Sequence, residues 1–222
     1  MKRARLVILA KTPVPGRVKS RLAASVGASA AARRYQRMLA EVACVGAATA
    51  SMDERVSVGV YFSPRRHPVL DRLSHRHGFT QHAQPLGDLG TRLKWIAHRE
   101  LVGMDALVII GGDCVGLSPE HLHRAFDKLH GGEDVVLAPA GDGGYTLIGL
   151  RSPARQLFLG IPWGGPDVLR RTLRQANRAG LSLYLLPTAT DLDDVGDLKS
   201  WRRRVGANVA WRPRAIPAYD GN

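Results

Sequence analysis

The feature that most constrains the fold is a run of five apolar residues, Ala106 to Ile110, which ends abruptly at Gly111-Gly112-Asp113. A short run that is apolar throughout and bounded by glycines is typical of a parallel strand buried on both faces. Because helices cover such sheets on both sides, the run predicts an α/β protein. It also places Asp113 at the point where a central strand leaves the sheet.

Apolar runs and amphipathic segments alternate along the rest of the 222-residue chain. Further strands are predicted at residues 6–10, 56–62, 79–84, 135–138, 145–150 and 181–186. Helices are predicted at residues 29–49, 69–77, 89–101, 167–179 and 195–205, and another begins at Pro119 with Ser118 as its N-cap. This alternation indicates a mainly parallel open sheet with helices on both faces. We expect a single domain over residues 1–205 and a C-terminal tail over residues 206–222.

The composition is that of an ordinary globular protein, with 45% hydrophobic and 23% charged residues. No apolar run approaches the ~20 residues needed to cross a bilayer. The apolar stretch from Leu6 to Ala10 behind the basic N-terminus is too short for a signal peptide. Two cysteines, Cys44 and Cys114, cannot build a disulfide framework or a four-cysteine zinc site. We therefore expect a cytoplasmic protein without a membrane span.

The net charge of +13 is compatible with nucleic-acid binding. However, the chain lacks a zinc finger, an RNP-like aromatic run and a convincing helix-turn-helix. We favour a solvated basic surface as the explanation, and an anionic small substrate would also suit the charge. A non-catalytic basic protein that binds nucleotides or nucleic acid is the alternative hypothesis.

The segment after the first predicted strand contains two prolines, one glycine and four cations, Lys11, Arg17, Lys19 and Arg21. An irregular backbone that presents N–H groups beside cations suits phosphate oxygens. The segment is not a Walker A loop, because the glycine spacing and the terminal Gly-Lys-Ser/Thr are absent. The two interpretations are a phosphate-binding loop, which we favour, and a solvated basic loop.

Three aspartates are candidate metal ligands. Asp113 suits a hard cation such as Mg²⁺, which is usually held by one or two carboxylates and substrate phosphates, but it could equally cap the next turn. Asp191 and Asp193 are two positions apart, so they share one face of an extended segment and could complete the site. Alternatively, they simply precede a helix that Asp194 caps.

Glycine-rich turns at residues 84–92 and 141–145 would permit a ligand to approach the backbone closely. These segments also occur together in one family. The combination of Ala-Lys-x-Pro-x-Pro-Gly-Arg-x-Lys-x-Arg-Leu, Gly-Asp-Gly-Gly-Tyr and Ile-Pro-Trp-Gly resembles the largely uncharacterised bacterial DUF2064 family. That family is glycosyltransferase-A-like and is related to nucleotide-diphospho-sugar transferases. The resemblance extends over nearly the whole chain up to about Val205.

The resemblance implies a Rossmann-like nucleotide-diphospho-sugar transferase fold and a metal-dependent transfer from a nucleotide sugar or nucleoside triphosphate to an unknown small acceptor. Residues matching the nucleotide-binding positions are Lys11, Arg17, Lys19, Arg21, Gln84, Gly87 and Asp88. Those matching the ligands of a Mg²⁺ or Mn²⁺ ion are Asp113, Asp191 and Asp193. Those on the acceptor side are Gly143, Gly144 and Tyr145. Asp113 and Lys19 are the candidate catalytic residues.

The chain departs from the family pattern at two places. The family usually has Gly-x-Asp-x-Pro-x-Leu at the metal strand, whereas Val115 stands in the position of the proline here and Gly116 follows. The second carboxylate pair is usually followed by Thr-Pro, and here Asp194-Val195 follow. The metal-binding aspartates themselves are present, so the departures concern the shape of the loops.

Overall fold

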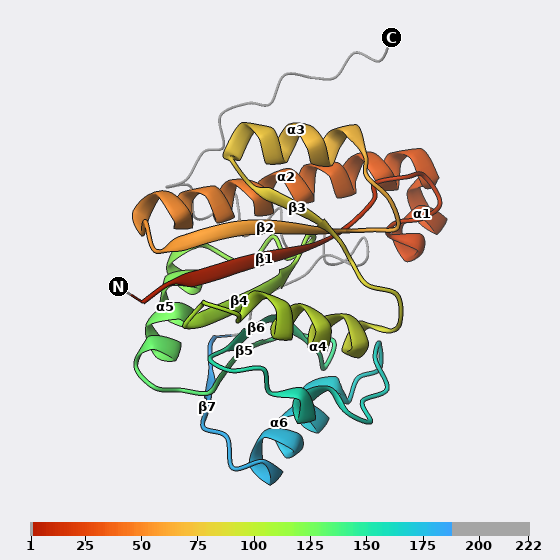
Figure 1. The fold of residues 1–222 in the computed structure, drawn as a ribbon. Coiled ribbons are helices and arrows are strands. Elements are labelled where there is room, and N and C mark those ends of the chain that lie inside the picture. Colours follow the sequence, from red (N-terminus) through yellow and green to blue (C-terminus); the bar gives the residue numbers. More distant parts are fainter. Residues whose placement is uncertain (1, 188–222) are drawn as a thin grey trace.

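A computed structural model describes residues 2–187 and contains a seven-stranded sheet with helices on both faces (Figure 1). The strand order is β3-β2-β1-β4-β6-β5-β7. This arrangement confirms the predicted α/β fold with an open, mainly parallel sheet. The predicted helix at residues 195–205, the aspartates Asp191 and Asp193 and the predicted tail lie outside the described residues.

Each strand predicted within this part of the chain is present. The strands are β1 (Ala4–Lys11), β2 (Val56–Ser63), β3 (Thr80–Ala83), β4 (Ala106–Gly111), β5 (Val135–Pro139), β6 (Tyr145–Leu150) and β7 (Leu183–Leu185). The pairings are parallel except those of β6, which runs antiparallel to both β4 and β5. A short turn at residues 140–144 connects β5 to β6, and a connection this short can only reverse the chain direction.

The helices follow the predicted pattern with two additions. They are α1 (Ser20–Val26), α2 (Ala28–Met52), α3 (Pro68–His77), α4 (Leu89–Glu100), α5 (Pro119–His130), the 3₁₀ helix η1 (Arg155–Phe158) and α6 (Val168–Arg178). The predictions contained neither α1 nor η1, which are too short to show helical periodicity. The basic loop therefore ends at Lys19, and Arg21 lies within a helix. No helix in the described range is both long and apolar enough to span a membrane.

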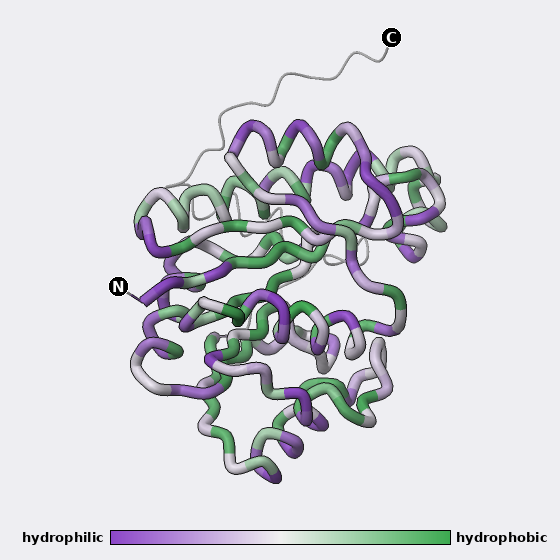
Figure 2. The backbone as a smooth tube through the Cα atoms, in the orientation of Figure 1, coloured by the Kyte–Doolittle hydropathy of each residue, from purple (hydrophilic) through white to green (hydrophobic). Residues whose placement is uncertain are grey.

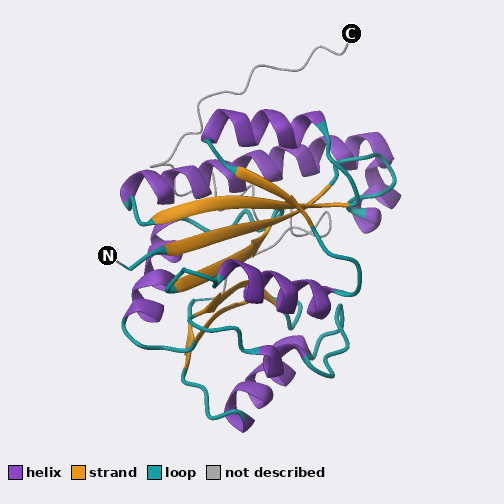
Figure 3. Ribbon diagram, viewed as in Figure 1, coloured by secondary structure: helices purple, strands orange, loops and turns teal. Residues whose placement is uncertain are grey.

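The core consists of two layers, one on each face of the sheet. Helices cover both faces of the sheet (Figure 3). Strand β4 contributes to both, because Val108 and Ile110 pack towards α2 and α5 while Leu107 and Ile109 pack towards α4. Hydrophobic residues accordingly follow the strands, and hydrophilic residues dominate the outer helix α3 (Figure 2). Burial on both faces thus explains why β4 is apolar at every position from Ala106 to Ile110. This burial fixes the end of β4, where Asp113 follows.

Candidate functional site

The candidate site lies where the carboxyl ends of β1, β3 and β4 meet at one edge of the sheet (Figure 1). Open α/β sheets bind their ligands at this edge. We call Lys11, Lys19, Gln84 and Asp113 the strand-end site. Each of these residues follows or ends one of the three strands, and the hydrogen bonds described below connect the segments that carry them.

An ion pair between Lys19 and Asp113 is the central contact of the strand-end site. Lys19 Nζ lies 2.9 Å from Asp113 Oδ2, and the side chains are 4% and 33% exposed, respectively. The ammonium group is therefore buried beneath a carboxylate that remains partly open to solvent. Both residues are candidate catalytic residues from the sequence, and in the structure their side chains are in contact.

The backbone at Lys19 is in the left-handed region, with φ 47° and ψ 52°. Lys19 is the only residue other than glycine with a positive φ in the range 2–187. This conformation costs a side-chain-bearing residue about 1–2 kcal/mol. It persists because Val18 and Leu22 on either side are buried in the core and hold the end of the loop in place.

Tyr35 of α2 holds the start of the basic loop. Its hydroxyl accepts a 2.8 Å hydrogen bond from the backbone N–H of Lys11. Burial raises the pKa of Tyr35 well above its ordinary value, and the negative charge of Asp113 adds to the increase. The hydroxyl therefore stays protonated close to the Asp113 carboxylate. Tyr35 is not among the predicted site residues.

Gly112 permits this close packing. A Cβ atom at this position would lie 2.9 Å from Leu39 Cδ1 and 3.1 Å from the Tyr35 hydroxyl. The Gly112 N–H also donates a 2.9 Å hydrogen bond to the carbonyl of Leu9. Gly112 thus fixes the chain immediately before Asp113 against β1.

Gln84 links the ends of β1 and β2. Its Nε2 donates to the carbonyl oxygens of Ala10 and Tyr61, at 3.2 and 2.8 Å. Its Oε1 accepts a 3.0 Å hydrogen bond from Arg92 of α4. The predicted nucleotide-pocket residue therefore joins the strand ends to the start of α4.

The two other predicted pocket residues of this segment lie at the start of α4. Asp88 is the N-cap, and its carboxylate accepts a 2.8 Å hydrogen bond from the backbone N–H of Thr91, which lowers the pKa of Asp88. Gly87 has φ 116°, and its carbonyl accepts a 2.9 Å hydrogen bond from Arg92 Nε. Both residues are exposed at the edge of the sheet.

The predicted acceptor segment forms the turn between β5 and β6. Gly143 has φ 87°, and a Cβ atom there would lie only 2.0 Å from the carbonyl oxygen of Pro166. The Gly143 carbonyl accepts a 2.9 Å hydrogen bond from Leu169, which fixes the turn to α6. Gly144 donates its N–H to Asp142 at 2.9 Å. The Tyr145 hydroxyl is buried, and this burial raises its pKa.

The remaining predicted cations lie on the surface. Lys11, Arg17 and Arg21 are exposed, in contrast to Lys19. The same loop contains a buried residue that the sequence did not single out, Thr12, whose hydroxyl donates a 2.5 Å hydrogen bond to the carbonyl of Arg65. Its only signal in the sequence is a small polar residue directly after a buried strand.

Asp113 is the predicted metal ligand that lies within the described residues. No group of three histidine, cysteine, aspartate or glutamate side chains that could hold a metal ion occurs within residues 2–187. Asp113 alone, partly exposed at a strand end, fits an ion that receives most of its other ligands from substrate phosphates and water. Asp191 and Asp193 remain predictions, because they lie outside the described residues.

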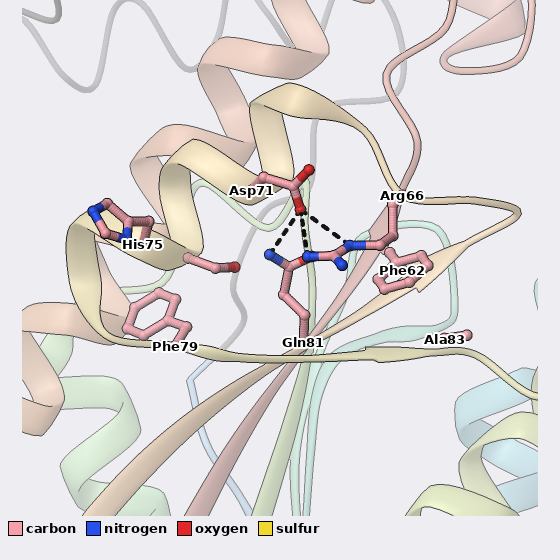
Figure 4. Close-up of a pocket in the computed structure, with 8 residues that line it drawn as sticks. Phe62, Arg66, Asp71, His75, Phe79, Gln81 and Ala83 are labelled. Atoms are coloured by element: carbon pink, nitrogen blue, oxygen red, sulfur yellow. Dashed lines mark hydrogen bonds and ion pairs between the residues drawn. The ribbon is translucent and has the colours of Figure 1, made fainter.

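A separate cavity of about 550 Å³ lies between α3 and β3 (Figure 4). Within it, Asp71 accepts hydrogen bonds from Arg66 and Gln81, each 3.1 Å long. The aromatic rings of Phe62 and Phe79 line the apolar part. The cavity contains none of the predicted site residues, and its carboxylate is already paired. We therefore place the candidate site at the strand ends.

A protein-family model described as "Uncharacterized protein conserved in bacteria (DUF2064)" matches residues 46–165. The chain belongs to this family. The match includes the Gln84 segment, the end of β4 with Asp113 and the Gly143 turn. No curated protein matches the chain.

Solved structures share the fold. A protein from Desulfovibrio desulfuricans G20, named as a candidate nucleotide-diphospho-sugar transferase, is 28% identical with a TM-score of 0.83, and the match covers 94% of this chain and 90% of that one. A nucleotidyl transferase from Methanothermobacter thermautotrophicus is 16% identical with a TM-score of 0.63, covering 94% and 100%. A cytidylyltransferase from Leptospira borgpetersenii is 11% identical with a TM-score of 0.59, covering 95% and 89%. The last two likenesses, at such low identity, show the fold alone.

Proposed function

We propose that this protein is a transferase that takes a glycosyl or nucleotidyl group from a nucleotide-containing donor, with Mg²⁺ or Mn²⁺ as cofactor. The observation that carries the proposal is the Lys19–Asp113 ion pair at the carboxyl end of the central strands. A carboxylate for a divalent ion and cations for phosphates are what a nucleotide donor requires. The likeness to a candidate nucleotide-diphospho-sugar transferase supports a nucleotide-containing donor.

The chain's own groups would act by position and charge. The exposed Lys11, Arg17 and Arg21 would bind the donor phosphates, and the glycine turn at residues 141–144 would lie beside the acceptor. Asp113 would hold the ion, and the chemistry that the ion supplies when bound is neutralisation of phosphate charge. Cations fixed before the reaction stabilise the negative charge that develops on the leaving phosphate.

Two reactions fit this site, and their products differ. In nucleotidyl transfer, an acceptor oxygen forms a bond to the α-phosphorus, the α–β phosphoanhydride bond breaks and pyrophosphate leaves. In glycosyl transfer, the acceptor oxygen forms a bond to the anomeric carbon and the bond to the nucleoside diphosphate breaks. In both cases the acceptor hydroxyl also loses its proton, which passes to the surrounding water. The identity of the released phosphate therefore distinguishes the two reactions.

The test is titration calorimetry with GTP, CTP, UTP and nucleotide sugars, with and without Mg²⁺ or Mn²⁺. We expect at least one donor to bind in a metal-dependent way. Asp113→Asn should weaken this binding at least tenfold, because the ion loses its protein ligand. Asp127→Asn on α5 removes the same charge from an exposed position and should leave binding unchanged. Absence of metal-dependent binding by every donor would refute the proposal.

The alternative is a non-catalytic protein that binds nucleic acid through its net charge of +13. Such binding weakens steeply with salt, since cations on the protein displace counterions from the phosphates. Removal of a carboxylate would then leave ligand binding intact or strengthen it. Asp113→Ala therefore separates the two functions, because the transferase predicts a loss and the alternative predicts none.

A further inference from the structure

The Lys19–Asp113 ion pair has a feature that phosphate binding alone does not explain. A phosphate-binding lysine needs an ammonium group that the ligand can reach, and the Lys19 side chain is only 4% exposed. Lys11, Arg17 and Arg21 of the same segment are exposed and available to phosphate oxygens. The ammonium group of Lys19 is instead paired with the carboxylate of Asp113.

The local fold holds Lys19 in this place at an energetic cost. Its backbone is left-handed, which side-chain-bearing residues rarely adopt, and its ammonium group is largely removed from water. On the other side of the pair, the Gly111–Gly112 backbone packs closely around the start of the Asp113 segment. Both partners of the pair are therefore fixed by the surrounding chain rather than brought together by chance on a surface.

A fixed cation beside a carboxylate weakens the attraction of that carboxylate for a second cation. The Lys19 charge compensates the Asp113 charge and also repels a divalent ion placed next to it. Donor phosphates carry negative charge of their own, so an ion that arrives bound to phosphates experiences less repulsion. The geometry thus favours joint entry of metal and donor over entry of the metal alone.

We propose that Lys19 is a counter-cation for Asp113, which suppresses binding of a free divalent ion and makes metal binding depend on the donor phosphates. This inference rests on the proposed function, since it assumes that Asp113 is a metal ligand. Lys19 is then a positioning residue that acts through Asp113. Its role is to set the order in which metal and donor bind.

The test measures binding of Mn²⁺ alone, from the electron paramagnetic resonance signal of the free ion. Lys19→Gly is the main variant, because glycine adopts the left-handed backbone readily and the fold should be retained. Lys19→Met removes the charge while keeping an apolar side chain of similar length. We expect both variants to bind Mn²⁺ at least tenfold more tightly than the wild type in the absence of nucleotide.

Two controls attribute the gain to the ion pair. Lys94→Met removes a cation from α4 and should change the affinity for Mn²⁺ less than twofold. Lys19→Gly combined with Asp113→Asn should return to the weak binding of the wild type. Thermal unfolding of each variant establishes that it is folded under the conditions of the titration.

The outcomes separate this inference from the proposed function. If the wild type binds Mn²⁺ with a nucleotide but the Lys19 variants bind Mn²⁺ alone no more tightly than the wild type, the inference is wrong and the function stands. If no variant and no nucleotide produces Mn²⁺ binding, both are wrong. Tighter binding by Lys19→Gly that persists after Asp113→Asn would also overturn the inference, since the ion would then lie elsewhere.

Discussion

At the scale of single residues, Gly143 determines the shape of the turn between β5 and β6. Its φ is 87°, and a Cβ atom would lie 2.0 Å from the carbonyl oxygen of Pro166. We expect Gly143→Ala to destabilise the protein by about 2–4 kcal/mol, from the cost of a left-handed alanine together with the overpacking. Urea unfolding measures the change.

Gly141 of the same turn is the matched control. A Cβ atom there would meet no atom within 4 Å, and its φ is not positive. Gly141→Ala should therefore change the free energy of unfolding by no more than about 0.5 kcal/mol. Equal losses in both variants would show that the contact with Pro166 does not determine the turn.

At the scale of secondary-structure elements, a buried polar network joins α4 to the sheet. Arg5 Nε of β1 lies 2.7 Å from Glu100 Oε2 at the end of α4, and both side chains are at most 10% exposed. Arg5 also donates a 2.5 Å hydrogen bond to Thr80 of β3, and the Tyr61 hydroxyl of β2 donates to Glu100. Arg5 and Glu100 together thus link three strands and a helix.

Arg5→Met should destabilise the protein by about 3–5 kcal/mol, because it leaves the Glu100 carboxylate buried without its cation. Arg151→Met breaks a more exposed pair with Asp134 and should cost only about 0–1 kcal/mol. Chemical denaturation of both variants tests the difference. Nucleotide binding by folded Arg5→Met should be unchanged, since Arg5 lies at the opposite end of β1 from Lys11. If Arg5→Met lowers the free energy of unfolding by 1 kcal/mol or less, the network does not hold α4 to the sheet.

Element by element, the sequence predicted the strands better than their directions. Hydrophobic periodicity identifies β4 as buried on both faces, because the pattern reports burial directly. It does not report which neighbour a strand pairs with, so the antiparallel direction of β6 became evident only from the structure. Helix α1 escaped prediction because seven residues are too few to show a period.

At the scale of the whole molecule, the candidate site depends on contacts between residues far apart in the chain. The sequence suggested Lys19 and Asp113 separately, since each has a chemically suitable side chain next to a predicted strand. Their pairing follows from the parallel alignment of β1 with β4, together with a left-handed backbone that no local pattern indicates. The anchoring of the loop by Tyr35 could not be predicted either, because its hydroxyl lies on an otherwise apolar helix face.

The stability of the whole molecule should depend on pH through Glu41 of α2. Burial raises the pKa of this carboxyl to about 7 from its ordinary value of 4.5. The fold therefore disfavours the charged form. Below pH 4.5 the carboxyl of Glu41 is protonated in both the folded and the unfolded state, so it does not lower the stability of the fold. Between pH 4.5 and 7 the unfolded state loses this proton first, so the free energy of unfolding falls. Above pH 7 the loss of stability is complete.

Glu41→Gln removes this dependence. Relative to the wild type, the variant should be about 1–2 kcal/mol more stable at pH 8, a value discounted for the partial solvent exposure of Glu41, and equally stable near pH 4. Glu120→Gln should show the opposite sign, because the Ser118 hydroxyl lowers the pKa of Glu120 and its charged form stabilises the fold at neutral pH. Urea unfolding of the three proteins across this pH range measures both effects. A Glu41→Gln difference that is constant with pH would show that this carboxyl is ionised equally in the folded and unfolded states.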